Sequence, residues 1–236
     1  VNVTNSTYIF SGAFSYVYYS SSGSSTKSES PLKITTVTLN EGIKNIGQYA
    51  FASINRYSST YSSTSYISNS RYQFQYSVLE TVNLPSTITS INYGAFYNCA
   101  KLDSVEIPGS VTSIDDYAFF GCSSLYTAIG SGVKTIGDYA FRGCSSLTNQ
   151  TFPTSLTSIG SYAFRGCSSF TEINIPQNVP SIGDYAFADC TKVEKISIEE
   201  GLKTIGGYAF QNINKVTSIV IPTTVKTMGS SLFSGM

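Results

Sequence analysis

Apolar residues recur along most of the chain with a fixed period. Ala-Phe pairs mark this period, with the phenylalanine at Phe51, Phe96, Phe119, Phe141, Phe164, Phe187 and Phe210. From Phe96 onward, successive phenylalanines are 22 or 23 residues apart. Leu232-Phe233 continues the series at one end, and Ala13-Phe14 is an earlier copy outside the regular array. A fixed period of this length predicts a solenoid in which each repeat stacks on the next.

One full repeat can be read from residue 102 to residue 124, with the sequence LDSVEIPGSVTSIDDYAFFGCSS. Its first part alternates between apolar and polar residues, which predicts a short strand with Val105 and Ile107 directed into the core. Pro108 cannot donate a backbone hydrogen bond, and so it ends this strand. Val111 and Ile114 then predict a second extended segment that also turns apolar side chains inward.

The last part of the repeat, DYAFFGC at residues 116–122, predicts a helix of only about two turns. Asp116 precedes it, as Asp138 and Asp184 precede the matching segments, so we interpret these aspartates as helix N-caps and not as calcium ligands. Glycine follows at the point where a helix would end, at Gly121, Gly143 and Gly166.

Two copies depart from this frame. The repeat around Ala128 and Ile129 is one residue short, and Gln150 stands where a valine or isoleucine would point inward. We therefore expect a local irregularity in this part of the solenoid.

The repeated pattern L-x-x-V-x-I-P-x-x-V-x-x-I-G-x-Y-A-F-x-x-C-x-x resembles the BspA-like leucine-rich repeat. The resemblance covers residues 32–53 and 79–236 well, and residues 1–14 loosely. It implies an α/β solenoid: a curved, right-handed stack of repeats with a concave parallel sheet on one side and short helices or turns on the other. It also implies a secreted or surface-attached microbial protein whose role is adhesion to host matrix, host proteins or other cells.

The chain is thus expected to form a single domain over residues 1–236 with two interruptions. Residues 15–30 and 54–78 exceed the repeat template, and both are rich in serine and tyrosine. The second could be an insertion or a degenerate repeat with Phe74 in the phenylalanine slot. Tyrosine and serine together are typical of antibody paratopes, so a ligand-binding segment is one interpretation. A low-charge loop with no binding role is the alternative. The candidate contact residues here are Tyr57, Tyr61, Tyr66 and Tyr72.

The outward positions of the first strands form a second candidate binding surface. They are polar and mixed in charge, and a solvated sheet face is the alternative to a ligand site. The candidates are Thr81, Asn83, Ser104, Glu106, Asn149, Thr151, Glu172, Asn174, Lys195 and Ser197, preceded by Thr36 and Thr38.

Cysteine recurs three residues after the phenylalanine, at Cys99, Cys122, Cys144, Cys167 and Cys190. Ile54, Ile213 and Met236 occupy this slot in other copies, so we expect buried thiols that act as small hydrophobic residues. Disulfides between neighbouring repeats are the alternative, because strands in adjacent repeats lie only about 5 Å apart. The tyrosine of the DYAF segment recurs as strictly, and we expect it to form a half-buried stack along one edge.

Composition narrows the function classes. Fourteen basic residues balance fourteen acidic ones, so the chain lacks the positive charge that nucleic-acid binding requires. It has no histidine, the commonest general base and metal ligand; we therefore predict neither an enzyme nor a cofactor or metal site. No apolar run is long enough to span a membrane.

These observations predict an extracellular or cell-surface binding module with a protein or glycan ligand. The alternative is a structural spacer that presents another domain and has no ligand of its own. No capping repeat is visible at either end, so we also expect either a fragment of a longer polypeptide or self-association through open ends.

Overall fold

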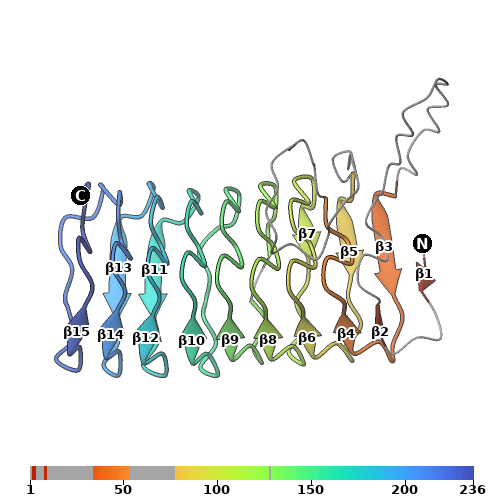
Figure 1. Ribbon diagram of the computed structural model, residues 1–236, viewed down its shortest axis with the longest axis horizontal. Coiled ribbons are helices and arrows are strands. Elements are labelled where there is room, and N and C mark those ends of the chain that lie inside the picture. Colours follow the sequence, from red (N-terminus) through yellow and green to blue (C-terminus); the bar gives the residue numbers. More distant parts are fainter. Residues whose placement is uncertain (1, 4–7, 10–33, 54–77, 128) are drawn as a thin grey trace, which may run out of the picture.

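The computed structural model describes residues 2–3, 8–9, 34–53, 78–127 and 129–236. Successive repeats form coils that lie side by side in sequence order along the long axis of the molecule (Figure 1). Adjacent strands pair in parallel throughout the described residues, as expected for a solenoid. The predicted right-handed sense of the coil stays a prediction.

The strands are short, and each coil contributes one or two of them. They are β1 (Asn2–Val3), β2 (Tyr8–Ile9), β3 (Thr36–Leu39), β4 (Asn45–Ile46), β5 (Thr81–Asn83), β6 (Ser90–Ile91), β7 (Ser104–Val105), β8 (Ser113–Ile114), β9 (Thr135–Ile136), β10 (Ser158–Ile159), β11 (Glu172–Ile175), β12 (Ser181–Ile182), β13 (Lys195–Ile198), β14 (Thr204–Ile205) and β15 (Thr227–Met228).

These strands make two faces of the solenoid. The second extended segments form one nine-stranded sheet in the order β15-β14-β12-β10-β9-β8-β6-β4-β2, which we call the continuous sheet. The first strands, which were expected to form the concave sheet, pair only as β1-β3-β5-β7 and as β11-β13. We call this second face the interrupted sheet, because no strand joins its two parts within the described residues.

The helices predicted in each repeat are absent from the described residues. Residues 116–121 form turns instead, because every second backbone N–H group bonds to the next coil, while the N–H groups between them bond only three residues back, as Phe120 N does to Tyr117 O at 3.1 Å. Tyr117 N donates to Asp138 O at 2.9 Å, and Phe119 N donates to Ala140 O at 2.8 Å. Tyr117 also has a left-handed backbone, with φ of 58°, which no α-helix accommodates.

The interpretation of the aspartates as helix N-caps is therefore wrong. Their carboxylates cap backbone groups of the neighbouring coil: Asp116 Oδ1 accepts from Asp138 N at 2.7 Å, and Asp138 Oδ1 accepts from Ser161 N at 2.6 Å. Asp184 bonds Gly207 N in the same way, at 2.7 Å. The glycines therefore end no helix, but they lie in turns with a left-handed backbone, as Gly121 does with φ of 72°.

A column of phenylalanines forms the centre of the core. Phe96, Phe119, Phe141, Phe164, Phe187 and Phe210 are fully buried. From Phe51 to Phe187, neighbouring rings are nearly parallel with centroids 5.1–5.3 Å apart. Each coil therefore completes its core only against its neighbours.

The tyrosine column is confirmed as a half-buried stack. From Tyr117 to Tyr208, successive rings lie nearly parallel with centroids 4.5–4.7 Å apart. Arginine guanidinium groups cover part of this edge: Arg142 lies 5.7 Å from the ring centroid of Tyr139, and Arg165 lies 5.7 Å from that of Tyr162. Stacking between tyrosine rings and cation–π contacts with the arginines thus hold neighbouring coils together along this edge.

The cysteines are confirmed as buried, free thiols. Each Sγ donates to the phenylalanine carbonyl of the preceding coil, as Cys122 does to Phe96 O at 3.0 Å and Cys144 to Phe119 O at 3.1 Å. Burial raises the pKa of every thiol from Cys122 to Cys190, and that of Cys190 reaches about 12. The thiol column is a structural part of the core.

The five thiols are expected to be inert in the folded protein, because the thiolate is the reactive form and burial suppresses it. An aromatic disulfide reagent should label none of the cysteines in native buffer and all five after denaturation in urea. Rapid reaction of any native thiol would contradict the packing described above.

The irregularity expected at Gln150 is confirmed. Its buried carboxamide replaces backbone pairing between two coils: Oε1 accepts from Ile129 N at 3.0 Å, and Nε2 donates to Thr127 O at 2.9 Å. The gap in the interrupted sheet falls in this region, between β7 and β11. Ala128, in the shortened repeat, lies outside the described residues.

The coils on either side of residues 54–77 pair directly with each other. β3 pairs with β5, β4 pairs with β6, and the rings of Phe51 and Phe96 stack with centroids 5.1 Å apart. The predicted interruption 15–30 and all but the last residue of 54–78 lie outside the described residues. Binding by these segments stays a prediction, with the candidates Tyr57, Tyr61, Tyr66 and Tyr72.

Candidate functional site

The candidate residues of the first strands lie on the outer side of the interrupted sheet, as their alternation predicted. Asn83, Ser104, Glu106, Asn149, Thr151, Glu172, Asn174 and Lys195 are exposed, while Thr81 and Ser197 are half-buried. The buried partners in the alternation, such as Val82, Val105 and Ile173, point into the core. That these residues bind a ligand stays a prediction.

Two of these side chains already have structural partners. The Asn83 carboxamide donates to Thr38 Oγ1 at 3.0 Å, which links β5 to β3. Asn149 Oδ1 accepts from Thr171 N at 2.7 Å and from Glu172 N at 3.1 Å, so it pairs with the start of β11 in place of a backbone carbonyl. Asn149 therefore holds two coils together.

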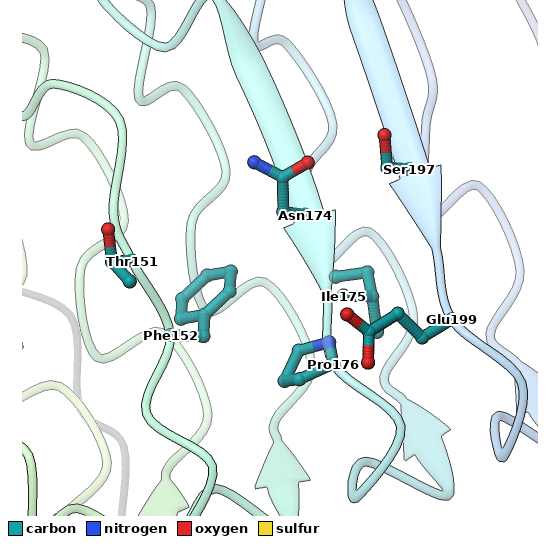
Figure 2. Close-up of a pocket in the computed structure, with 7 residues that line it drawn as sticks. All are labelled: Thr151, Phe152, Asn174, Ile175, Pro176, Ser197 and Glu199. Atoms are coloured by element: carbon teal, nitrogen blue, oxygen red, sulfur yellow. The ribbon is translucent and has the colours of Figure 1, made fainter.

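Three other candidates line one depression on the interrupted sheet: Thr151, Asn174 and Ser197. Its volume is about 260 Å³, and its remaining walls come from Phe152, Ile175, Pro176 and Glu199. Figure 2 shows Thr151 and Phe152 on one coil, facing β11, which carries Asn174 and Ile175. The depression therefore lies where the ladder of the interrupted sheet is broken.

The floor of the depression is part of the core. Ile175 is almost fully buried, and Phe152 is 8% exposed. The Phe152 ring lies 5.4 Å from that of Phe164 and 6.3 Å from that of Phe187, measured between centroids. Because Phe152 packs on the central column, the floor of the depression is rigidly placed.

The rim of the depression is polar. Asn174 and Ser197 lie opposite each other in the β11–β13 register, and Thr151 provides a hydroxyl on the other side. Glu199 is exposed, and its Oε2 accepts from Gln177 N at 3.0 Å, which orients the carboxylate. Apolar floor and polar rim together are typical of ligand sites.

Sequence reasoning missed four residues of this depression: Phe152, Ile175, Pro176 and Glu199. Phe152 and Ile175 occupy inward positions of the strand pattern, which predicts core residues, and Glu199 lies just beyond β13. The departure from the repeat at Gln150 was the available signal, because broken pairing leaves space between coils.

Some charged groups elsewhere in the described part of the chain pair with one another. Arg165 Nε forms an ion pair with Asp189 Oδ2 at 2.7 Å, and Asn212 Nδ2 donates to Asp189 Oδ1 at 2.6 Å. Burial raises the pKa of the Asp189 carboxyl, but the bonds from Asn212 and Arg165 outweigh this effect and hold that pKa below its ordinary value. Within the described ranges, no three His, Cys, Asp or Glu side chains are grouped so that they could hold a metal ion.

None of the described residues forms a helix that could cross a membrane.

Comparison with known families adds the decisive observation. The family described as BspA type Leucine rich repeat region matches residues 28–126 and 126–236, with six copies. The chain belongs to the BspA-type leucine-rich repeat family. Leucine-rich repeat solenoids of this type are typically non-enzymatic repeat scaffolds.

Solved structures of bacterial leucine-rich repeat proteins are similar to the chain. One, from Bacteroides ovatus ATCC 8483, is 28% identical with a TM-score of 0.68, over 84% of this chain and 46% of that protein. Another, from T. pallidum, is 32% identical with a TM-score of 0.62, over 65% of this chain and 75% of that protein. The chain thus spans less than half of the Bacteroides protein. The curated proteins contain no match.

Proposed function

We propose that the chain is an extracellular or cell-surface binding module that takes a macromolecular ligand on the interrupted sheet. Membership of the BspA-type family supports the surface location, because proteins that resemble this family are expected to be secreted or surface-attached and to act in adhesion. The observation that carries the binding role is the depression of about 260 Å³ lined by Thr151, Asn174, Ser197 and Glu199.

The composition of this face supports binding to a protein or glycan. Thr151, Asn174 and Ser197 provide hydroxyl and amide groups, and Glu199 adds one carboxylate. The continuous sheet, by contrast, presents a uniform row of outward serine and threonine residues that includes Ser113, Thr135, Ser158, Ser181 and Thr204. A distinct depression on one face and a uniform row on the other favour the interrupted sheet as the binding face.

A matched pair of substitutions tests this proposal. Thr151 and Thr135 are both exposed threonines in neighbouring coils, but only Thr151 borders the depression. On an array of matrix proteins and glycans, Thr151→Trp should weaken binding by about tenfold or more, because the indole fills the depression. Thr135→Trp on the continuous sheet should leave binding unchanged.

A third protein, lacking residues 55–77, separates the depression from the tyrosine-rich segment. Loss of binding in this deletion alone would place the site outside the depression. Binding by neither the parent protein nor the variants would instead favour the structural spacer, which has no ligand of its own.

The proposal includes self-association, which the final coil supports. Met228 is 58% exposed, whereas Ile205, in the same slot of the preceding coil, is fully buried. Val220 and Met236 are also exposed, so this coil presents apolar surface that a second copy of the chain can cover. The protein should sediment as a concentration-dependent oligomer, and Met228→Lys should shift it toward the monomer. A monomer at all concentrations would contradict self-association.

A further inference from the structure

The strand that borders the depression, β11, has one edge without a backbone partner among the described residues. In a parallel pair, alternate residues direct their N–H and C=O groups to opposite neighbours. Ile175 O accepts from Glu199 N at 3.0 Å, so Ile175 faces β13. Asn174 must therefore face the other way, toward the coil that carries Thr151 and Phe152.

Asn149 provides hydrogen-bond partners for the backbone at the beginning of this edge but not for the backbone at its middle. Its carboxamide accepts from the N–H groups of Thr171 and Glu172. Outside the β11–β13 ladder, in which Asn174 lies opposite Ser197, no hydrogen bond among the described residues reaches the backbone N–H or C=O of Asn174, and Thr151 and Phe152 make no backbone bond to β11. Asn174 thus presents a backbone donor and acceptor on the edge of β11 away from β13, and this residue lines the depression (Figure 2).

We infer that this open edge recognises the main chain of an extended peptide segment in a partner protein. A strand edge with free N–H and C=O groups is a template for β-strand addition, in which main-chain hydrogen bonds supply affinity and adjacent pockets supply specificity. A residue of the ligand exchanges two hydrogen bonds with Asn174, and its neighbouring side chain lies over Pro176 in the depression. This inference rests on the proposed function and names the class of ligand for the same site.

The charge at the end of the edge selects the ligand further. Glu199 is exposed, and its carboxylate is oriented by the Gln177 N–H. Neither of the two ion pairs found among the described residues involves Glu199. Lys195 lies opposite Glu172 in the β11–β13 register and offsets its charge, so Glu199 carries the uncompensated charge at the site. The preferred peptide carries a lysine or arginine near its paired residue.

The test begins with a library of random peptides about six residues long, the usual length of a strand. Peptides selected on the full chain are expected to be enriched in basic and β-branched residues. The substitution Glu199→Gln should weaken the binding of these peptides by several-fold. Their binding is then compared between two substitutions at one position. Asn174→Pro removes the free N–H without removing a bond to β13, whereas Asn174→Ala removes only the side chain.

Main-chain recognition predicts that Asn174→Pro weakens peptide binding by about tenfold or more relative to Asn174→Ala, which removes the rim carboxamide but keeps the backbone N–H. Equal losses in the two variants would overturn the inference, because the side chain would then be the recognised group. Amide hydrogen exchange gives a readout that does not depend on folding of the proline variant. The Asn174 amide should exchange rapidly in the free protein and become protected when a selected peptide binds.

Two further outcomes separate this inference from the proposed function. If glycans bind in a manner that Thr151→Trp abolishes, and no peptide protects the Asn174 amide, the binding face is correct and peptide recognition is wrong. If neither peptides nor the array of matrix proteins and glycans bind, both proposals fail together.

Discussion

Phe164→Ala is expected to lower the free energy of unfolding by about 3–5 kcal/mol, the range for truncation of a buried phenylalanine. Phe164 is fully buried. Its ring stacks between those of Phe141 and Phe187, each with a centroid distance of 5.3 Å, and it also contacts Phe152 at 5.4 Å. Urea denaturation followed by circular dichroism measures the loss. Because Phe152 forms the floor of the depression, this substitution should also weaken ligand binding.

Phe120→Ala provides the control for this prediction. Phe120 is half-buried at the tyrosine edge, where its ring stacks on Tyr97 with a centroid distance of 4.8 Å. Truncation of this half-buried side chain leaves no internal cavity, so we expect the free energy of unfolding to fall by only about 1 kcal/mol. Similar losses for both substitutions would show that the phenylalanine column does not dominate the stability of the solenoid.

Gly201→Ala is expected to cost about 3 kcal/mol or more, because it combines backbone strain with overpacking. Gly201 has φ of 124°, a conformation that L-residues rarely adopt. A Cβ atom here would collide with Gln177 O in the preceding coil and would lie 3.0 Å from Gln177 C. The backbone could relieve this contact only by separating two coils. Thermal and urea denaturation of the variant measure the effect.

Gly42→Ala separates strain from collision. Gly42 occupies the same slot in an earlier coil, with φ of 98°, and its N–H donates to Thr87 Oγ1 at 2.9 Å, as that of Gly201 does to Thr224 Oγ1 at 3.0 Å. A Cβ atom added at Gly42 would have no described atom within 4 Å, so we expect only the strain, about 1–2 kcal/mol. Equal losses of unfolding free energy in the two variants would show that the close contact with Gln177 O does not add to the backbone strain.

The candidate site was only partly predictable from the sequence. Alternation in the first strands correctly placed Thr151, Asn174 and Ser197 on the outer side of a sheet. It did not reveal that Asn149 would pair with β11 or that Glu199 would lie beside the same depression. Side-chain direction depends on local alternation, whereas these contacts depend on how far apart two coils lie.

The helices are the clearest error of sequence reasoning. The segment after Asp116 has a cap-like aspartate, a short apolar stretch and a glycine, which is the local pattern of a short helix. In the solenoid, however, a parallel neighbour lies about 5 Å away along the whole segment. Phe119 N therefore donates to Ala140 O in the next coil. Pairing between coils thus takes every second N–H group of the segment, and only isolated local bonds such as Phe120 N to Tyr117 O remain in place of a continuous helix.

The sequence by itself determined that this protein is a solenoid, which residues fill its core, and that its thiols and tyrosines form columns. A repeat of 22 or 23 residues places equivalent side chains above one another, so one period predicts the burial of all of them. Only the tertiary structure decided which sheet is continuous, which carboxamides replace backbone bonds, and where Asn174 keeps a free edge. These features depend on hydrogen bonds between neighbouring coils, which the pattern within a single repeat does not specify.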